Sequence, residues 1–531
     1  MTRGDAGGME TGLLHETIPA YSKIEEICAE NEYPAIIPVY AVFDDTFPRP
    51  AEAFGILRED GCRDGGFILE SLEGNEKLAR YSILGFNVRA KITISDKTEI
   101  TGDREFTGKP EGEISGDPLE AARAAIKNPR FSNTGIPIFP GGFTGYFSYD
   151  MVYSLHPGRL GSRKKNEDND FPLAEFLMPG EYIVYDHFEN SVYFASLLKI
   201  GENTDARSEY LNAAGRIAGM VDLLRTGKAP ARDSAGGQPA GEKSEYISPT
   251  GKESYEEMVS SAREYIYSGD IFQAVVSRKF ECEFGGDPYS IYRALRKINP
   301  SPYMYYIDFG GRQVIGASPE MLVRCRKGVV STVPIAGTRK RGMTPEEDAA
   351  LAEELLADGK ECSEHIMLVD LARNDIGRIS KYGTVRLPQF MDVEKFSHVQ
   401  HIVSTVEGDL SDGLDGFDAL RSCFPAGTVS GAPKIRAMEI IDELETEARG
   451  LYAGAVGYIC PDGDIDFAIA IRTVLAENGK LTIQAGAGIV ADSVPETEFF
   501  ETESKAAGII KSIDAAGGKG AEAMRNGGIV R

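Results

Sequence analysis

Basic residues are scarce in this 531-residue sequence, which has 57 lysines and arginines against 82 aspartates and glutamates and a formal net charge of −25 at pH 7. Nucleic acid and anionic membranes would be repelled by this charge, so we expect neither as a partner. The same charge means that an anionic substrate requires local positive groups in order to bind.

Cysteines and long apolar runs are also few. The seven cysteines are scattered, odd in number and without a Cys-x-x-Cys pair. This pattern argues against a disulfide framework or a zinc ribbon and is typical of a reducing compartment. No apolar run approaches the ~18 residues of a spanning helix, and the first residues lack the apolar segment of a signal peptide. We therefore expect a cytoplasmic protein without a membrane anchor.

The sequence does contain enough apolar residues, 42%, for a globular protein. The chain is too long for one ordinary core, so we expect two or three domains. Residues 226–248 are rich in glycine, alanine, proline and serine and predict a linker. The predicted organisation is an N-terminal region at 10–225, the linker, a second domain at 249–513 and a flexible tail at 514–531.

Strand-like runs arrive in groups, with helical segments inserted between them. Parallel βαβ units would alternate strand with helix, so this order predicts an α+β fold with antiparallel sheets. A glycine-rich aromatic stretch at 137–150 predicts a hairpin with a structural role.

The most informative stretch spans residues 484–505. Residues 481–484 alternate as in a strand, and they are followed by Gly486, Ala487 and Gly488. Two of these three residues lack a Cβ, so the backbone there can approach a ligand closely.

A helix follows this glycine segment. Ser493 and Glu496 predict a capping box at its start. Glu498, Glu501 and Lys505 then share one face at i, i+3 and i+7. Two carboxylates one turn apart can hold a hard cation, and the lysine can reach an anion beside it.

A second stretch, at 358–378, has the same arrangement of carboxylates as the first. Thr344 predicts the cap of a helix that runs to Asp358. Asp358 and Glu361 predict another capping box, and Glu361 and Glu364 again lie one turn apart. Two helices that each present a Glu-x-x-Glu pair can meet around one Mg²⁺, which takes few carboxylates and keeps water or substrate oxygens. The alternative is that both pairs are solvated surface, the common role of paired glutamates in an acidic protein.

Eight blocks in the second half occur in the order seen in chorismate-utilising enzymes. They are residues 316–320 (Gly-Ala-Ser-Pro-Glu), 334–339 (Pro-Ile-Ala-Gly-Thr-Arg), 361–378, 397–401 (Ser-His-Val-Gln-His), 424–434, 450–454 (Gly-Leu-Tyr-Ala-Gly), 469–473 and 484–505. Residues 250–510 resemble anthranilate synthase component I, which makes anthranilate from chorismate. The resemblance implies antiparallel sheets packed as a sandwich with helices on the outside.

The resemblance also implies roles for individual residues. The metal ligands for Mg²⁺ would be Glu364 and Glu501, supported by Glu361 and Glu498. The general acid would be Glu320, with His398 as the other candidate, whereas His365 and His401 are expected to be structural. The residues that would bind the chorismate carboxylates and ring are Gly337, Thr338, Thr428, Tyr452, Arg472, Gly486, Ala487, Gly488 and Lys505.

Two positions distinguish the sister reactions. Isochorismate and salicylate synthases have a lysine base where this chain has Gln273, and a glutamine cannot deprotonate water. Aminodeoxychorismate synthases commonly have a lysine where this chain has Ala336, so no covalent route is available there. The expected function is that of anthranilate synthase; the alternatives are aminodeoxychorismate synthase component I or a chorismate- or tryptophan-binding regulator without turnover.

Two further molecules are implied. None of the seven cysteines has the setting of a glutaminase nucleophile, so we expect a separate glutamine amidotransferase subunit in a heterodimer or heterotetramer. The stretches around residues 69–71 and 299–304 resemble the pair that binds tryptophan as a feedback inhibitor. The residues assigned to that site are Ser71, Pro302, Tyr303 and Met304.

Overall fold

The computed structural model describes residues 17–30, 35–44, 46–59, 65–72, 80–108, 116–127, 131–132, 134–136, 139–163, 171–227, 246–396 and 399–517. His398, most of the predicted linker and the predicted tail beyond residue 517 lie outside this part of the chain. All of the named strand pairs are antiparallel. The structure therefore confirms the expected α+β class.

Strand pairing arranges the strands in two layers that share the long strands β3 and β6. The first layer runs in the spatial order β1 (Ala35–Phe43), β7 (Ser191–Ile200), β6 (Ala174–Asp186), β3 (Tyr81–Ile94), β2 (Gly66–Glu70), β9 (Tyr303–Asp308), β10 (Arg312–Ser318), β19 (Thr473–Glu477), β20 (Lys480–Ile489), β8 (Gln273–Glu283) and β16 (Gly431–Ala432).

The second layer continues from the other halves of β3 and β6. Its remaining strands are β4 (Thr98–Gly102), β5 (Phe143–Phe147), β17 (Ala455–Ile459), β18 (Ile465–Ile469), β11 (Met321–Arg326), β12 (Val329–Thr332), β15 (Val399–Asp409), β13 (Ile335–Lys340) and β14 (Arg386–Lys395). The register of β3 on β6 breaks between Val88 and Ala90, where the flanking strands change from β2 and β7 to β4 and β5. A bulge at this point allows both strands to bend from one layer into the other.

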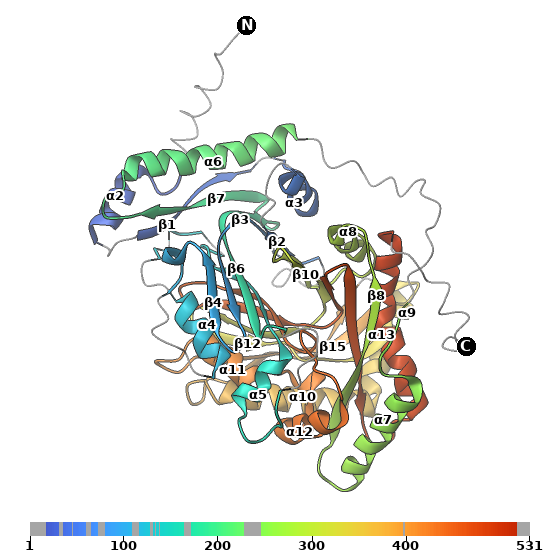
Figure 1. Cartoon of the computed structure of the whole chain (residues 1–531). Coiled ribbons are helices and arrows are strands. Elements are labelled where there is room, and N and C mark those ends of the chain that lie inside the picture. The colour runs from blue at the N-terminus through green and yellow to red at the C-terminus, as the bar shows by residue number, and fades with distance from the viewer. Residues whose placement is uncertain are drawn as a thin grey trace.

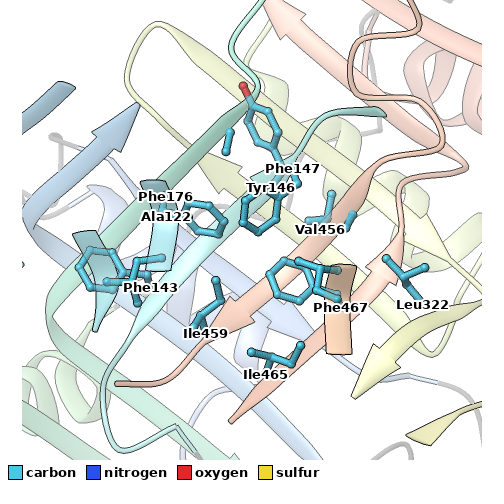
Figure 2. Packing of buried hydrophobic residues seen from close by; sticks show 14 of the residues in the cluster. Ala122, Phe143, Tyr146, Phe147, Phe176, Leu322, Val456, Ile459, Ile465 and Phe467 are labelled. Atoms are coloured by element: carbon cyan, nitrogen blue, oxygen red, sulfur yellow. The ribbon is translucent and has the colours of Figure 1, made fainter. Parts of the chain in front are cut away.

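Two large cores follow from the alternation of side chains along these strands. On β9, Tyr305 and Ile307 belong to the core between the layers, whereas Met304 and Tyr306 belong to a second core under the helices. Both faces of β9 are therefore buried, as expected for an inner strand. Figure 2 shows part of the first core, in which aromatic residues of β5 and β6 pack against Val456 and Phe467.

Helices cover the outer faces. Those on the first layer are α2 (Tyr21–Glu30), α3 (Pro50–Glu59), α6 (Ala206–Thr226), α8 (Pro288–Ile298) and α13 (Pro495–Ala515), with α7 (Lys252–Tyr267) beside α13. The others are α4 (Pro118–Ile126), α5 (Val152–Leu155), α9 (Pro345–Ala357), α10 (Gly359–Gly377), α11 (Gly416–Cys423) and α12 (Lys434–Leu444), with short 3-10 turns η1 (Arg104–Phe106), η2 (Tyr149–Met151) and η3 (Gly427–Val429). Figure 1 shows α6 lying across β7, and α13 and α7 flanking β8. Of the helices in the described ranges, none combines the length and the apolar character needed to cross a membrane.

The two predicted domains share hydrogen-bonded strands. Strand β2 of the first half pairs with β9 of the second, and β5 pairs with β17. The predicted boundary at 226–248 therefore divides the sequence but not the sheet. The predicted hairpin at 137–150 is wrong, because β5 has no partner within that stretch and lies between β6 and β17.

Helix caps were predicted with mixed success. The side chains of Thr344 and Asp358 accept hydrogen bonds from backbone N–H groups at the starts of α9 and α10, as expected. The return bond that would complete the capping box predicted for Asp358 and Glu361 is not among the hydrogen bonds of the described residues. The capping box predicted for Ser493 is wrong, because its Oγ accepts a hydrogen bond from the backbone N–H of Val490 at 3.1 Å. Helix α13 instead begins at Pro495, with no side-chain cap.

Candidate active site

The glycine segment lies inside β20 and not in a loop after a strand. It pairs with β8, with Gly486 opposite Ser277 and Gly488 opposite Val275. An added Cβ would stand 2.6 Å from the Tyr452 hydroxyl at the first glycine and 2.6 Å from Gln273 Nε2 at the second. An added side chain would require Tyr452 or the β8 backbone to shift at Gly486 and the Gln273 amide to move at Gly488, so glycine leaves room for two predicted site residues.

Lys505 of α13 lies at the centre of the site. Its Nζ donates to the carbonyl of Gly486 at 3.0 Å and lies 3.5 Å from Glu501. Its charge also lowers the pKa values of Glu320 and Glu364, opposing the effect of burial on both. The charge of Lys505 therefore acts on groups from β20, α13, α10 and the turn before β11.

Glu320 occupies the turn between β10 and β11. Burial raises the pKa of its carboxyl to about 7, although Thr428, Arg472 and Lys505 act in the opposite direction. The buried Thr428 Oγ1 has no hydrogen-bond partner of good geometry in the described part of the chain. A carboxyl that is half protonated near neutral pH can serve as a general acid, and the Thr428 hydroxyl beside it can bind a substrate oxygen.

Arg472 follows β18 with a left-handed backbone, φ +49°, and Ala453 beside Tyr452 has φ +64°. This conformation costs a non-glycine residue ~1–2 kcal/mol and persists only where surrounding contacts impose it. The Arg472 carbonyl accepts from the N–H of Ala317 at 3.1 Å. The turn brings the guanidinium close enough to influence the pKa of both Glu320 and His401.

His401 lies beside two residues that are predicted to bind chorismate. Its Nδ1 lies 2.9 Å from the carbonyl of Gly337 and 3.1 Å from Thr338 Oγ1. Because a carbonyl only accepts, Nδ1 carries the hydrogen and Nε2 is left with a lone pair. Burial lowers the pKa of His401; the Gly337 carbonyl raises it and Arg472 lowers it further, so the ring is neutral at pH 7.

Roles were also expected for His398 and His365. His398 lies outside the described residues, so the structure does not place it. His365 is buried, with Nε2 2.6 Å from Ser404 Oγ, in keeping with the structural role expected for it. His401 was missed because it reaches the site through the pairing of β13 with β15, where it lies opposite Thr338. No local sequence pattern encodes that pairing.

The four carboxylates of the two Glu-x-x-Glu pairs do not all lie together. Burial, and after it the charge of Glu361, raises the pKa of Glu364. Glu361 lies 3.5 Å from the guanidinium of Arg339. Glu498 lies near Tyr255 of α7, whose pKa it helps to raise. Lys505 thus links Glu364 with Glu501, while Glu361 and Glu498 have other neighbours.

The arrangement of these carboxylates bears on metal coordination. Within the described ranges, no three histidine, cysteine, aspartate or glutamate side chains lie close enough to share one ion. Mg²⁺ commonly takes only one or two carboxylates and completes its shell with water and substrate. Burial raises the pKa of Glu364 and the charge of Glu361 raises it further, and a divalent cation would favour the charged carboxylate against both effects. The residues therefore fit Mg²⁺ with few protein ligands.

A separate cavity of about 520 Å³ lies where β2 pairs with β9. Ser71, Pro302, Tyr303 and Met304 all line it. The buried Ser71 Oγ has no hydrogen-bond partner among the described residues. The Met304 side chain packs in the core under the helices, so it supports the wall from behind. The two stretches expected to bind tryptophan are therefore brought together.

Comparison with known proteins agrees with this geometry. Residues 67–511 match the model of the chorismate binding enzyme family. The chain is 44% identical to anthranilate synthase component 1 of Acetivibrio thermocellus over 94% of this chain and 99% of that relative. It is 43% identical to anthranilate synthase component 1 of Aquifex aeolicus over 93% and 98%.

A solved structure shows the same fold. Anthranilate synthase component I from Streptococcus pneumoniae superposes with a TM-score of 0.69 at 39% identity, covering 83% of this chain and 95% of that one. High identity over nearly the full length of these relatives makes the relationship one of family as well as fold. The chain therefore belongs to the chorismate binding enzyme family, among the anthranilate synthase component 1 proteins.

Proposed function

We propose that this chain converts chorismate and ammonia into anthranilate and pyruvate, as the aminase subunit of an anthranilate synthase in tryptophan biosynthesis. The similarity to named anthranilate synthase components over more than 90% of the chain supports this reaction. The observation that carries it is the Glu320 carboxyl, whose pKa is raised to about 7 beside Arg472, Lys505 and the Thr428 hydroxyl.

Proton delivery is the first requirement of the reaction. Ammonia adds at C2 of the chorismate ring while the C4 hydroxyl leaves, and that hydroxyl must take up a proton to depart as water. The protonated Glu320 carboxyl can supply it near neutral pH. His398 remains the other candidate for this donor, and it lies outside the described residues. The neutral His401 ring has a different role open to it, because Nε2 can accept a proton from the incoming amine.

Anion recognition is the second requirement, since chorismate is a dicarboxylate and the chain has a net charge of −25. Arg472 offers a guanidinium that matches a carboxylate in two parallel hydrogen bonds. The Thr428 hydroxyl adds a neutral donor beside Glu320, and the Tyr452 hydroxyl adds one beside Gly486. The Gln273 amide, against Gly488, orients an amine without activating water.

Magnesium is the proposed cofactor. Glu364 and Glu501 would hold the ion, with Glu361 and Glu498 in support. Bound there, Mg²⁺ would act as a Lewis acid and template on the ring carboxylate. Lys505 lies between the two Glu-x-x-Glu pairs and compensates part of their negative charge.

Two partners are proposed with this function. "Component 1" in the names of the relatives implies a second component, and we infer that it is a glutamine amidotransferase that supplies ammonia in a cytoplasmic heterodimer or heterotetramer. Tryptophan is the proposed inhibitor, supported by the 520 Å³ cavity and the unsatisfied Ser71 hydroxyl. A cavity of this size accommodates an amino acid with a bicyclic ring.

One assay tests the reaction. The purified chain is incubated with chorismate, Mg²⁺ and an ammonium salt at alkaline pH, and anthranilate is followed by fluorescence while chromatography identifies all products. We expect anthranilate and pyruvate in equal amounts. Accumulation of isochorismate, salicylate or 4-amino-4-deoxychorismate as the main product would overturn the assignment.

A further inference from the structure

Arg449, in the loop between α12 and β17, is buried behind the proposed active site, only 4% exposed. Its guanidinium forms a two-pronged pair with Glu445, from Nε to Oε2 at 2.8 Å and from Nη2 to Oε1 at 2.7 Å. Glu445 is itself only 6% exposed. The pair is therefore an ion pair taken almost completely out of water.

The remaining donors of Arg449 bind two backbone carbonyls that belong to the site. Nη1 donates to Val429 at 2.8 Å, and Nη2 donates to Val275 at 2.6 Å. Val429 directly follows Thr428 in η3, and Val275 lies two residues after Gln273 on β8. One side chain thus holds the backbone of two elements that present predicted substrate-binding or catalytic side chains.

A third site element stacks on the same guanidinium. The Arg449 Cζ atom lies 5.5 Å from the centre of the Tyr452 ring and 4.7 Å from that of Tyr149. The opposite end of the Tyr452 ring carries the hydroxyl that touches Gly486. A planar cation between two rings restricts their tilt, so Arg449 sets where this hydroxyl points.

Glu445 extends the network into the paired strands. Its Oε1 accepts from both the N–H and the hydroxyl of Ser277 at 2.8 Å, and Gln484 Nε2 donates to the same hydroxyl at 2.9 Å. Ser277 lies opposite Gly486 in the β8–β20 ladder. The carboxylate therefore fixes the two strands at the point where the glycine segment begins.

Stability alone does not require such a pair. Removing two charges from water costs several kcal/mol, and apolar side chains of similar volume often replace a buried ion pair with no loss of stability. What an apolar pair cannot reproduce is the set of directed bonds from one side chain to two carbonyls, a carboxylate and two rings.

We propose that Arg449, oriented by Glu445, is a positioning residue for the chorismate site: it fixes Tyr452, Thr428 and Gln273 relative to one another and so determines how the substrate is held. The substrate named here rests on the proposed function. Every contact of Arg449 named above is with a backbone carbonyl, the Glu445 carboxylate or an aromatic ring, so it acts on the substrate through these groups.

Conservative and apolar replacements separate positioning from stability. Arg449→Lys keeps the charge but loses the fork and the stacking, and we expect kcat/KM for chorismate to fall about 10- to 100-fold, mostly through KM. The double variant Arg449→Met with Glu445→Leu replaces the whole ion pair by apolar side chains. Its thermal midpoint should lie within a few degrees of the parent, while its kcat/KM stays low. The matched control is Arg312→Lys, which alters another buried arginine, paired with Glu175 away from the site, and should lower the thermal midpoint without changing kcat/KM.

A second readout does not depend on the substrate. Hydrogen exchange of the peptides that contain Thr428 and Gly488 should rise in Arg449→Lys and remain at the parental level in Arg312→Lys. Parental exchange in these peptides, or recovery of both kcat/KM and midpoint in the double variant, would show that the pair is merely structural. If exchange rises in Arg449→Lys but the parent makes no anthranilate, the positioning role is upheld and the proposed function is refuted.

Discussion

The cavity proposed for tryptophan and the site proposed for chorismate are built in different ways. The first has walls on β2, β9, β11 and β18, an enclosed volume of about 520 Å³ and a buried, unsatisfied hydroxyl on Ser71. The second takes its carboxylates from α10 and α13, where the side chain of Glu501 is 48% exposed and, among the described residues, no three metal-ligating side chains converge.

The difference follows from the elements involved. Strand residues are fixed by hydrogen-bonded neighbours on both sides, so the cavity between them is formed by folding itself. Glutamates on two helices repel one another, and the charges of Lys505, Lys360 and Arg339 offset this repulsion in part. We infer that folding completes the first site, whereas a metal ion and the substrate complete the second.

The largest expected effect comes from removing a proposed metal ligand. Glu501→Gln should lower anthranilate formation at least about 1,000-fold while leaving the far-ultraviolet circular dichroism unchanged, because several kcal/mol of charge stabilisation depend on the ion. Glu496→Gln, on the same helix and paired with Lys252, is the matched control and should keep parental activity. Activity that survives in Glu501→Gln, or in the parent after EDTA treatment and desalting, would contradict a metal site here.

The next effect concerns the proton donor. Glu320→Gln should lower kcat by about 100-fold or more, since general acid catalysis typically contributes that much. In the parent, kcat for a fixed concentration of free ammonia should decline as pH rises past the pKa of about 7. A variant with parental kcat would contradict this role, and His398→Gln, which alters the other candidate acid, is then the variant to assay.

A smaller effect is expected in the strand-built cavity. Ser71→Ala should raise the tryptophan concentration needed for half inhibition about 10-fold, because one hydrogen bond to a charged ligand is lost. Turnover with ammonia should stay at the parental level. Ser290→Ala, which alters a hydroxyl that bonds the Asp287 carbonyl on α8, should change neither quantity.

Met304→Thr should also weaken inhibition, by less than Ser71→Ala. The Met304 side chain lies in the core behind the cavity wall, so the substitution acts through the position of β9 and should lower the thermal midpoint as well. Inhibition that is fully retained in both variants would place the tryptophan site elsewhere.

The smallest effect is on stability. The Glu320 carboxyl has an ordinary pKa of 4.5 and a folded-state pKa of about 7, so the free energy of unfolding falls as pH rises through this window. Glu320→Gln removes the titration and should be about 1–3 kcal/mol more stable than the parent at pH 8 but equal to it at pH 4. Urea unfolding without metal or chorismate measures the difference; the same gap at both pH values would contradict the raised pKa.

The sequence predicted what depends on local pattern. Alternation and helix caps at Thr344 and Asp358 indicated the elements, and the grouping of strands indicated an antiparallel fold. Pairing over more than 200 residues, as between β2 and β9, is invisible to such patterns because it depends on packing of the whole chain. The same limit explains why two site groups were missed or misjudged: His401 joins the site through the β13–β15 ladder, and Arg449 through bonds to three separate elements.

Glycine also misled the prediction. Gly486 and Gly488 are poor strand formers, so the strand was expected to end at Gln484. The ladder with β8 extends it to Ile489, because the missing Cβ atoms make room for Tyr452 and Gln273 and the packing gained outweighs the propensity lost. The contacts of the site, and not the strand propensity of glycine, therefore decide where β20 ends.

Calorimetry on the metal-free chain tests the contrast between the two sites most directly. Tryptophan and chorismate are titrated separately into EDTA-treated, desalted protein, before and after Mg²⁺ is restored. The expected result is that tryptophan binds with the same affinity in both conditions, whereas chorismate binds at least about 10-fold more tightly with Mg²⁺. Equal chorismate affinity with and without Mg²⁺, or tryptophan binding that requires the metal, would contradict the account.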